Sequence, residues 1–147
     1  PIITQYANPE KELEGILTRI QMEDLDDVAI LVPSDKEVMM VNDYLANHGI
    51  KTQVMYRTGN TVPFRTVNTL DFSNNDLPCI LTYYAAKGSE FDNVFVPFAN
   101  TSNDCSRNSF YVACTRSSRS LYISYSGTKT KYLSDVNSDF ITELKAA

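Results

Sequence analysis

Apolar residues recur along the first part of the chain at spacings that distinguish helices from strands. Asn8 and Pro9 precede apolar residues three and four positions apart, which is typical of a capped amphipathic helix. The uncharged run from Val28 to Val32 is typical of a strand buried on both faces. Ser34 to Glu37 has a capping-box pattern, and the apolar stripe after it ends at Gly49, so a second helix is predicted there.

The second half alternates in the same way. Lys51 to Tyr56 predicts a strand, and the polar segment from Arg57 to Pro78 predicts a connector with at most one short strand. The remaining predicted elements are strands at Cys79 to Tyr83, Val94 to Phe98 and Leu121 to Tyr125, and helices at Ser106 to Cys114 and from about Ser134 through Leu144. The alternation predicts an α/β fold of three layers, with helices on both faces of a mainly parallel sheet and ligands at the carboxyl ends of its strands.

Length and composition favour one domain over residues 1–147, because 43% of the residues are hydrophobic and no internal repeat is visible. No apolar run approaches the roughly 20 residues needed to cross a bilayer. Pro1 to Thr4 also lacks the features of a signal peptide. We therefore expect a cytoplasmic protein with no membrane contact. The start at Pro1 predicts that the chain is a fragment of a longer protein.

The cysteines and the net charge exclude two common binding modes. Cys79, Cys105 and Cys114 form no CxxC pair, and His48 is the only histidine, so the usual zinc sites cannot be assembled. We expect buried free thiols. The formal charge of -5 argues against broad binding to a nucleic-acid backbone, so any DNA contact must be local or shared with another domain.

Thr82 to Asp92 carries the most informative chemistry, because it lies directly between two predicted strands. Gly88 permits a sharp turn, while Lys87 and Glu90 present opposite charges three residues apart. Such a loop suits a phosphate, a ribose or a neighbouring domain. From composition alone, a surface turn with a solvated ion pair is the simpler interpretation.

This stretch resembles motif V of UvrD/Rep-like superfamily-one DNA helicases, T-x-H-x-x-K-G-x-E-F-D, with Tyr84 in place of the histidine. Tyr111 to Ser117 resembles motif VI of the same family, Y-V-A-x-T-R-A, between a predicted helix and a predicted strand. Their order, separation and setting together make chance resemblance a poor explanation. The resemblance is to the C-terminal, second RecA-like motor domain and extends over nearly the whole chain.

In that family ATP lies between two RecA-like domains, and the resemblance implies roles for four residues here. Arg116 matches the arginine finger opposite the γ-phosphate, and Glu90 matches an acceptor for the ribose. Lys87 and Gly88 would shape the ATP-binding loop. An ordinary surface arginine at a helix end is the alternative for Arg116, and a solvated pair with Glu90 is the alternative for Lys87.

The resemblance also implies DNA-binding residues. Thr82 and Tyr84 match positions that face single-stranded DNA, and a threonine hydroxyl suits a phosphate oxygen. Tyr84 departs from the family pattern. A phenol can hydrogen-bond a phosphate or stack on a base, but it carries no charge. Packing in the core is an equally consistent role for this side chain.

The 147 residues contain no G-x-x-x-x-G-K-[ST] sequence, so the phosphate-binding loop and the Mg²⁺ ligands would lie in the first motor domain, outside this chain. The expected cofactors are ATP and Mg²⁺, neither held tightly by the fragment, which should be inactive alone. The expected partners are single- or double-stranded DNA and the missing N-terminal RecA-like domain, in a DNA-repair setting. The short connector from Arg57 to Pro78 leaves no room for the large accessory domain that many members insert before motif V.

Two other functions fit parts of the pattern. A non-catalytic α/β interaction module derived from a helicase would keep the motifs as structure, and the acidic charge and Tyr84 favour it. A flavodoxin- or receiver-like domain fits the alternation of strands and helices. It does not explain the Thr-Arg pair after a helix, and the predicted strand ends lack a clustered acidic pocket.

Overall fold

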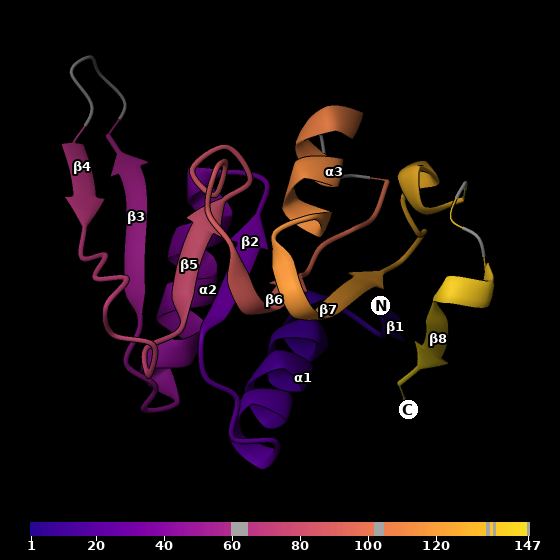
Figure 1. Ribbon diagram of the computed structural model, residues 1–147, viewed down its shortest axis with the longest axis horizontal. Helices are drawn as coiled ribbons and strands as arrows, with labels where there is room; N and C mark the ends of the chain where they lie inside the picture. Colours follow the sequence, from indigo (N-terminus) through magenta and orange to yellow (C-terminus); the bar gives the residue numbers. More distant parts are fainter. Residues whose placement is uncertain (60–64, 102–104, 135, 137, 147) are drawn as a thin grey trace.

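The computed structural model describes residues 1–59, 65–101, 105–134, 136 and 138–146, which form one eight-stranded sheet with helices on both faces (Figure 1). The strands, in chain order, are β1 (Ile2–Tyr6), β2 (Val28–Val32), β3 (Gln53–Thr58), β4 (Arg65–Asn68), β5 (Cys79–Thr82), β6 (Phe91–Val96), β7 (Ser117–Ser126) and β8 (Thr142–Lys145). Their spatial order is β4-β3-β5-β2-β6-β7-β1-β8, and every neighbouring pair is parallel except β3 and β4. The predicted mainly parallel α/β sheet is confirmed.

Helices α1 (Pro9–Met22) and α2 (Asp35–Asn47) cover one face of the sheet (Figure 1). Their apolar stripes, represented by Ile16 and Val41, pack on alternate strand residues such as Ile30 and Ile80. All five residues of β2 are buried, because the strand lies between β5 and β6 and has side chains packed on both faces. This is the continuous apolar pattern expected of a central parallel strand.

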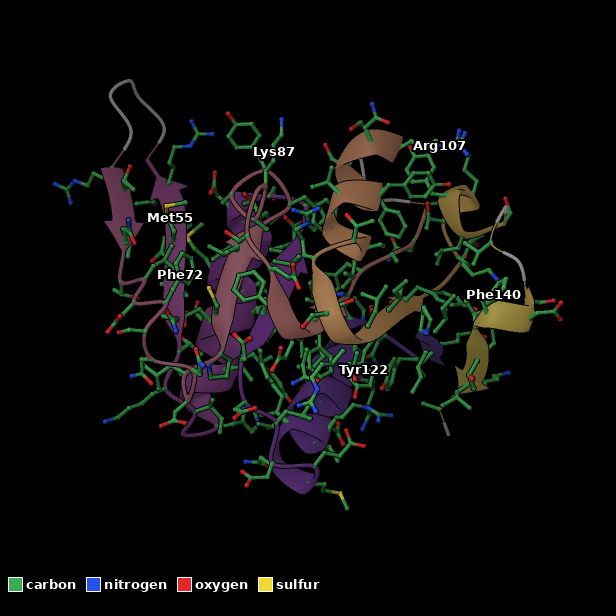
Figure 2. The ribbon with its side chains drawn as sticks, in the orientation of Figure 1. Met55, Phe72, Lys87, Arg107, Tyr122 and Phe140 are labelled. Carbon is green, nitrogen blue, oxygen red and sulfur yellow. The ribbon has the colours of Figure 1, made fainter. Side chains whose placement is uncertain are left out.

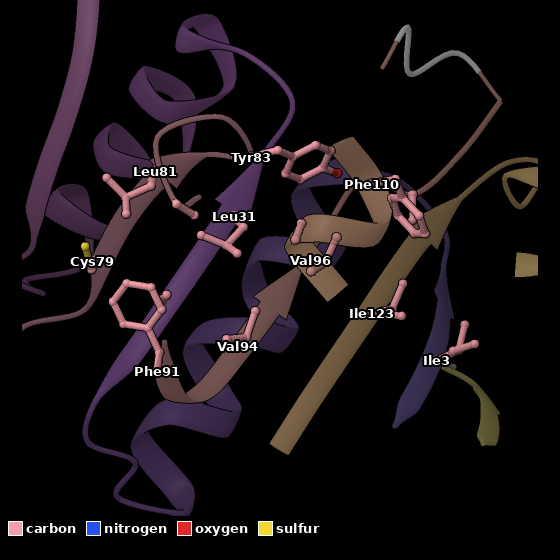
Figure 3. Close-up of a cluster of buried hydrophobic side chains, with 14 of the residues drawn as sticks. Ile3, Leu31, Cys79, Leu81, Tyr83, Phe91, Val94, Val96, Phe110 and Ile123 are labelled. Carbon is pink, nitrogen blue, oxygen red and sulfur yellow. The ribbon is translucent and has the colours of Figure 1, made fainter. Parts of the chain in front are cut away.

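Helix α3 (Arg107–Cys114) lies on the opposite face. Phe110 and Ala113 of α3 pack with Leu31, Val96 and Ile123 of the sheet (Figure 3). The residues that alternate with these along the strands face α1 and α2, so each central strand contributes to two separate apolar clusters. The predicted three layers are therefore confirmed.

Both predicted helices begin where expected, but only α1 has the side-chain hydrogen bond of an N-cap. The Asn8 side chain accepts a hydrogen bond from the Lys11 amide at 2.9 Å, and Pro9 is the first residue of α1, as predicted. Ser34 occupies the N-cap position of α2, but its hydroxyl donates to the Glu37 carboxylate instead of accepting from a backbone amide. The second helix starts where predicted, without that backbone bond.

The predicted final helix is wrong. Residues 134–144 contain a 3-10 turn at Ser138–Phe140 and then strand β8, which pairs in parallel with β1. The Thr142 amide donates to the Pro1 carbonyl at 3.0 Å, and the Ala146 amide donates to the Gln5 carbonyl at 2.9 Å. No strand was predicted at residues 2–6, so the unpaired backbone groups of β1 that β8 satisfies were not foreseen.

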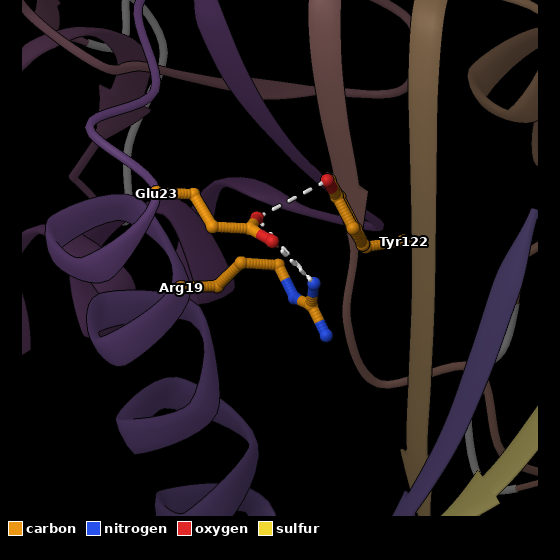
Figure 4. Close-up of polar contacts among 3 residues, drawn as sticks. All are labelled: Arg19, Glu23 and Tyr122. Atoms are coloured by element: carbon orange, nitrogen blue, oxygen red, sulfur yellow. Dashed lines mark hydrogen bonds and ion pairs between the residues drawn. The ribbon is translucent and has the colours of Figure 1, made fainter.

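Polar contacts fix the end of α1 to strand β7 (Figure 4). The Arg19 guanidinium lies 4.6 Å from the centre of the Tyr122 ring and donates to the Glu23 carboxylate at 3.2 Å. The Tyr122 hydroxyl reaches the same carboxylate at 3.5 Å. These contacts place a cation over an aromatic face and satisfy its charge within one helical turn.

None of the three cysteines is in a disulfide, as predicted, but only Cys79 is buried. Cys105 and Cys114 are half-buried. Burial raises the pKa of the Cys79 and Cys114 thiols to about 12. At neutral pH both are therefore protonated and behave as small apolar side chains.

Within the described ranges, no helix is long and apolar enough to cross a membrane. The same residues contain no group of three or more His, Cys, Asp or Glu side chains able to hold a metal ion.

Candidate functional site

The loop after β5 is a compact turn held by its own backbone and by one hydroxyl. Thr82 Oγ1 accepts a hydrogen bond from the Ala85 amide at 3.1 Å, and the Ser89 amide donates to the Ala86 carbonyl at 3.0 Å. Gly88 has a φ of 85°, in the left-handed region that favours glycine. The Thr82 hydroxyl hydrogen is not used in these bonds, so it remains available as a donor.

The side chains of this loop reach solvent. Tyr84 is 85% exposed, which excludes the predicted alternative of packing in the core. Lys87 projects beyond the carboxyl ends of the strands (Figure 2). Among the residues whose placement is described, neither Lys87 nor Glu90 forms an ion pair, so the predicted alternative of a paired surface turn is not observed.

A loop directly after a parallel strand is expected at the carboxyl edge of the sheet, but this loop does not stay there. Strands β5 and β6 both run parallel to β2, so the chain must return to the opposite edge before β6 begins. Glu90 directly precedes β6 and therefore lies near the amino ends of the strands. Thr82 and Tyr84 lie at the carboxyl ends.

Arg116 connects the end of α3 to the start of β7 and contacts the returning loop. Its Nη1 donates to the carbonyl of Ser89 at 3.3 Å, and its carbonyl accepts from the Phe91 amide at 2.9 Å. Arg116 therefore lies beside Glu90, although the two residues are 26 positions apart in the sequence. The backbones of the two residues are adjacent where β6 and β7 begin.

Two further acceptors hold the Arg116 guanidinium. Nε donates to the Val112 carbonyl at 3.0 Å, and Nη2 donates to Thr115 Oγ1 at 3.0 Å. The side chain is half-buried and makes no ion pair in the part of the chain that the structure describes. Its bond to the Val112 carbonyl, in the last turn of α3, also fits the alternative of an ordinary arginine that stabilises a helix end.

A groove of about 500 Å³ opens at the carboxyl edge and includes Thr82 and Tyr84 in its lining. Met55, Tyr56 and Arg57 of β3 form its other side. These three residues were not predicted as part of a site, because no local pattern shows that β3 pairs with β5. The β3 sequence Gln-Val-Met-Tyr-Arg-Thr has no regular alternation of apolar and polar residues, so it gives no signal of a side that faces the loop.

The six predicted residues thus divide between two places. Glu90 and Arg116 lie together near the amino ends of β6 and β7, while Thr82 and Tyr84 line the groove. Lys87 and Gly88 lie on the loop that joins the two. A second groove of about 460 Å³, between α1 and the last residues of the chain, is lined by Tyr6, Lys11, Arg19 and Met22 among others and includes none of the six.

Part of this chain is similar in sequence to a known family, and its fold is similar to that of solved structures. Residues 78–124 match the sequence profile of the UvrD-like helicase C-terminal domain family. This segment, which holds both candidate motifs, is therefore similar to the C-terminal domain of UvrD-like helicases. The matched region is about a third of the chain and runs from the start of β5 into β7. No curated protein sequence matches the chain significantly.

Solved structures share the fold of this chain over almost its whole length. The C-terminal domain of a possible DNA helicase from Lactobacillus plantarum WCFS1 has a TM-score of 0.77 at 23% identity, covering 97% of this chain and 84% of that one. The E. coli DEAD-box protein SrmB has a TM-score of 0.63 at 14% identity, over 99% and 88%. Truncated PRRSV nsp10, a helicase, has a TM-score of 0.59 at 12% identity, over 99% of this chain and 46% of that one. The fold is RecA-like.

Proposed function

We propose that this chain is the second RecA-like motor domain of an ATP-dependent DNA helicase. Another RecA-like domain would supply the phosphate-binding loop and the Mg²⁺ ligands. The observation that carries the proposal is the contact between Arg116 and the Ser89 carbonyl, which fixes the guanidinium beside the residue that precedes the exposed Glu90. A cation and an acceptor placed together suit the phosphates and the ribose of one nucleotide.

In the proposed site Arg116 acts as the arginine finger. A permanently charged, planar guanidinium beside the γ-phosphate stabilises the charge that develops on the transferring group. Glu90 accepts a hydrogen bond from a ribose hydroxyl, and Lys87 and Gly88 shape the loop. These residues suit ATP but not its metal ion, because the described residues contain no cluster of metal ligands. Mg²⁺ would therefore be held by the other domain.

The groove at the carboxyl edge is the proposed contact for single-stranded DNA. The Thr82 hydroxyl already accepts a bond from Ala85, which leaves its hydrogen free to donate to a phosphate oxygen. Tyr84 is exposed beside it and provides a flat face on which a base can stack. The separation of this groove from Arg116 leaves room for DNA and nucleotide to bind at the same time.

The test is ATP turnover by the complete protein, with Arg116→Ala compared with Arg119→Ala. Arg119 is an exposed arginine three residues further along the chain and is a matched control for loss of positive charge. We expect Arg116→Ala to lower kcat by about a thousandfold or more, as for other arginine fingers, and Arg119→Ala to have no comparable effect. Equal turnover in the two variants would exclude the finger. Absence of turnover in the wild-type protein would favour the non-catalytic module.

A further inference from the structure

Arg116 is unusually well held for a side chain at the surface of a domain. A guanidinium has five N–H groups, and three of them are engaged by Val112, Ser89 and Thr115 within this chain. Two N–H groups remain for an anionic ligand. The three acceptors come from the end of α3 and from the loop after β5, so both segments fix the plane of the guanidinium.

Thr115 makes the one side-chain contact among these three. Its hydroxyl donates to the Val112 carbonyl at 2.9 Å while Oγ1 accepts from Nη2 of Arg116 at 3.0 Å. The same Val112 carbonyl accepts from Nε of Arg116 at 3.0 Å. The bond to Val112 orients the hydroxyl, so that a lone pair of Oγ1 points at the guanidinium.

The place of this network on the helix adds an electrostatic reason for its geometry. Val112 lies in the last turn of α3, where backbone carbonyls carry partial negative charge, and its carbonyl also accepts from the Thr115 amide at 3.2 Å. A cation at this end is stabilised by those carbonyls. The Thr115 hydroxyl adds one more acceptor beside these carbonyls. Its bond to Nη2 favours one orientation of the Arg116 guanidinium.

We propose that Thr115 is a positioning residue for Arg116 and holds the guanidinium in its reactive orientation before a nucleotide binds. The proposal rests on the proposed role of Arg116 in ATP hydrolysis. A charge that is already in place need not be ordered in the transition state, so positioning of this kind acts on kcat more than on KM.

Two substitutions separate the hydroxyl from the rest of the side chain. Thr115→Val keeps the branched shape but removes both the donor to Val112 and the acceptor for Nη2. Thr115→Ser keeps both. Thr115 is exposed, so neither change opens a cavity in the core.

The first measurement is steady-state ATP turnover by the complete protein. We expect Thr115→Val to lower kcat about 10- to 100-fold with KM changed less than about threefold, and Thr115→Ser to stay within about threefold of wild type. If Thr115→Val keeps the wild-type kcat while Arg116→Ala abolishes turnover, the positioning role is wrong and the finger stands. If Arg116→Ala also leaves turnover unchanged, the proposed function fails and the positioning role fails with it.

The second measurement needs no activity and uses the present chain labelled with ¹⁵N. Three fixed N–H groups should slow rotation of the Arg116 guanidinium, so we expect resolved Nη signals in the wild type and in Thr115→Ser. In Thr115→Val the guanidinium should rotate faster, so its Nη signals should merge into an average. Identical Arg116 spectra in the wild type and Thr115→Val would overturn the proposal.

Discussion

At the scale of single residues, Glu12 is the side chain whose position is hardest to reconcile with its charge. It is fully buried in α1, and its carboxylate accepts from the Phe98 amide at 2.9 Å and from the Ser124 and Ser126 hydroxyls at 2.8 and 3.1 Å. Burial raises the pKa of Glu12 above its ordinary value of 4.5, although these three bonds partly oppose the shift. The carboxylate ties α1 to the ends of β6 and β7.

The raised pKa predicts how stability depends on pH. The folded state favours protonated Glu12. The stabilisation that the raised pKa of Glu12 gives to the folded state is therefore fully present below pH 4.5 and is lost as the pH rises through the folded pKa. Glu12→Gln cannot ionise, and its amide can keep the three contacts if the Ser126 hydroxyl reverses its role. In urea unfolding at a series of pH values, we expect this variant to gain stability relative to wild type as the pH increases from 4.5 towards neutrality.

Glu14→Gln serves as the control for this measurement, because Glu14 is an exposed carboxylate on the same helix. Its difference from wild type should vary little over the same range, since exposed ion pairs contribute little. A Glu12→Gln difference that is flat with pH would show that Glu12 titrates alike in the folded and unfolded states.

At the scale of elements, the end of the chain is a strand that one neighbour stabilises. β8 lies at the edge of the sheet, and all four of its residues are exposed. Phe140 and Leu144, whose spacing suggested a helix, are also exposed, at 74% and 47%. Phe140 lies beside β8 at the outer end of the molecule (Figure 2). Backbone pairing with β1, not burial of an apolar face, therefore determines the structure here.

Hydrogen exchange distinguishes this strand from a helix residue by residue. In an edge strand alternate amides point to the neighbour, so we expect the Thr142 and Ala146 amides, bonded to β1, to exchange slowly. The Glu143 and Lys145 amides should exchange quickly. The amides of α1 provide the internal reference for continuous helical protection. Similar protection at all four of these positions would contradict the strand.

At the scale of the whole molecule, the net charge of -5 limits how the domain can contact DNA. Attraction to the phosphate backbone is weak overall, so any affinity should depend on local contacts such as the exposed ring of Tyr84 in the groove. Binding through such contacts would differ from general electrostatic attraction in its dependence on single side chains.

We expect Tyr84→Ala to weaken binding of a fluorescent oligothymidine by about 5- to 100-fold, the range for loss of one stacked base. Tyr84→Phe should bind within about threefold of wild type, because it retains the aromatic face. Fluorescence anisotropy at low salt measures both. Phe140→Ala is the matched control, since Phe140 is an exposed aromatic residue outside the groove. An equal loss in Phe140→Ala, or no loss in Tyr84→Ala, would count against the groove as the contact.

Several features of the protein were determined by local sequence alone. The central strand β2, helix α1 with its Asn8 cap, and the turn at Gly88 each follow from side-chain periodicity or backbone freedom over a few residues. The segments that carry the two helicase motifs could also be placed between their strands, because the patterns on either side are long and clear.

The tertiary structure alone decided which of these segments meet. β8 became a strand because β1 offered unpaired backbone groups from the other end of the chain. The groove formed because β3 pairs with β5, and Arg116 reached Ser89 because the loop after β5 must return across the sheet before β6. Periodicity reports the environment of each residue along its own element, whereas strand order depends on contacts between residues distant in sequence, which no local pattern encodes.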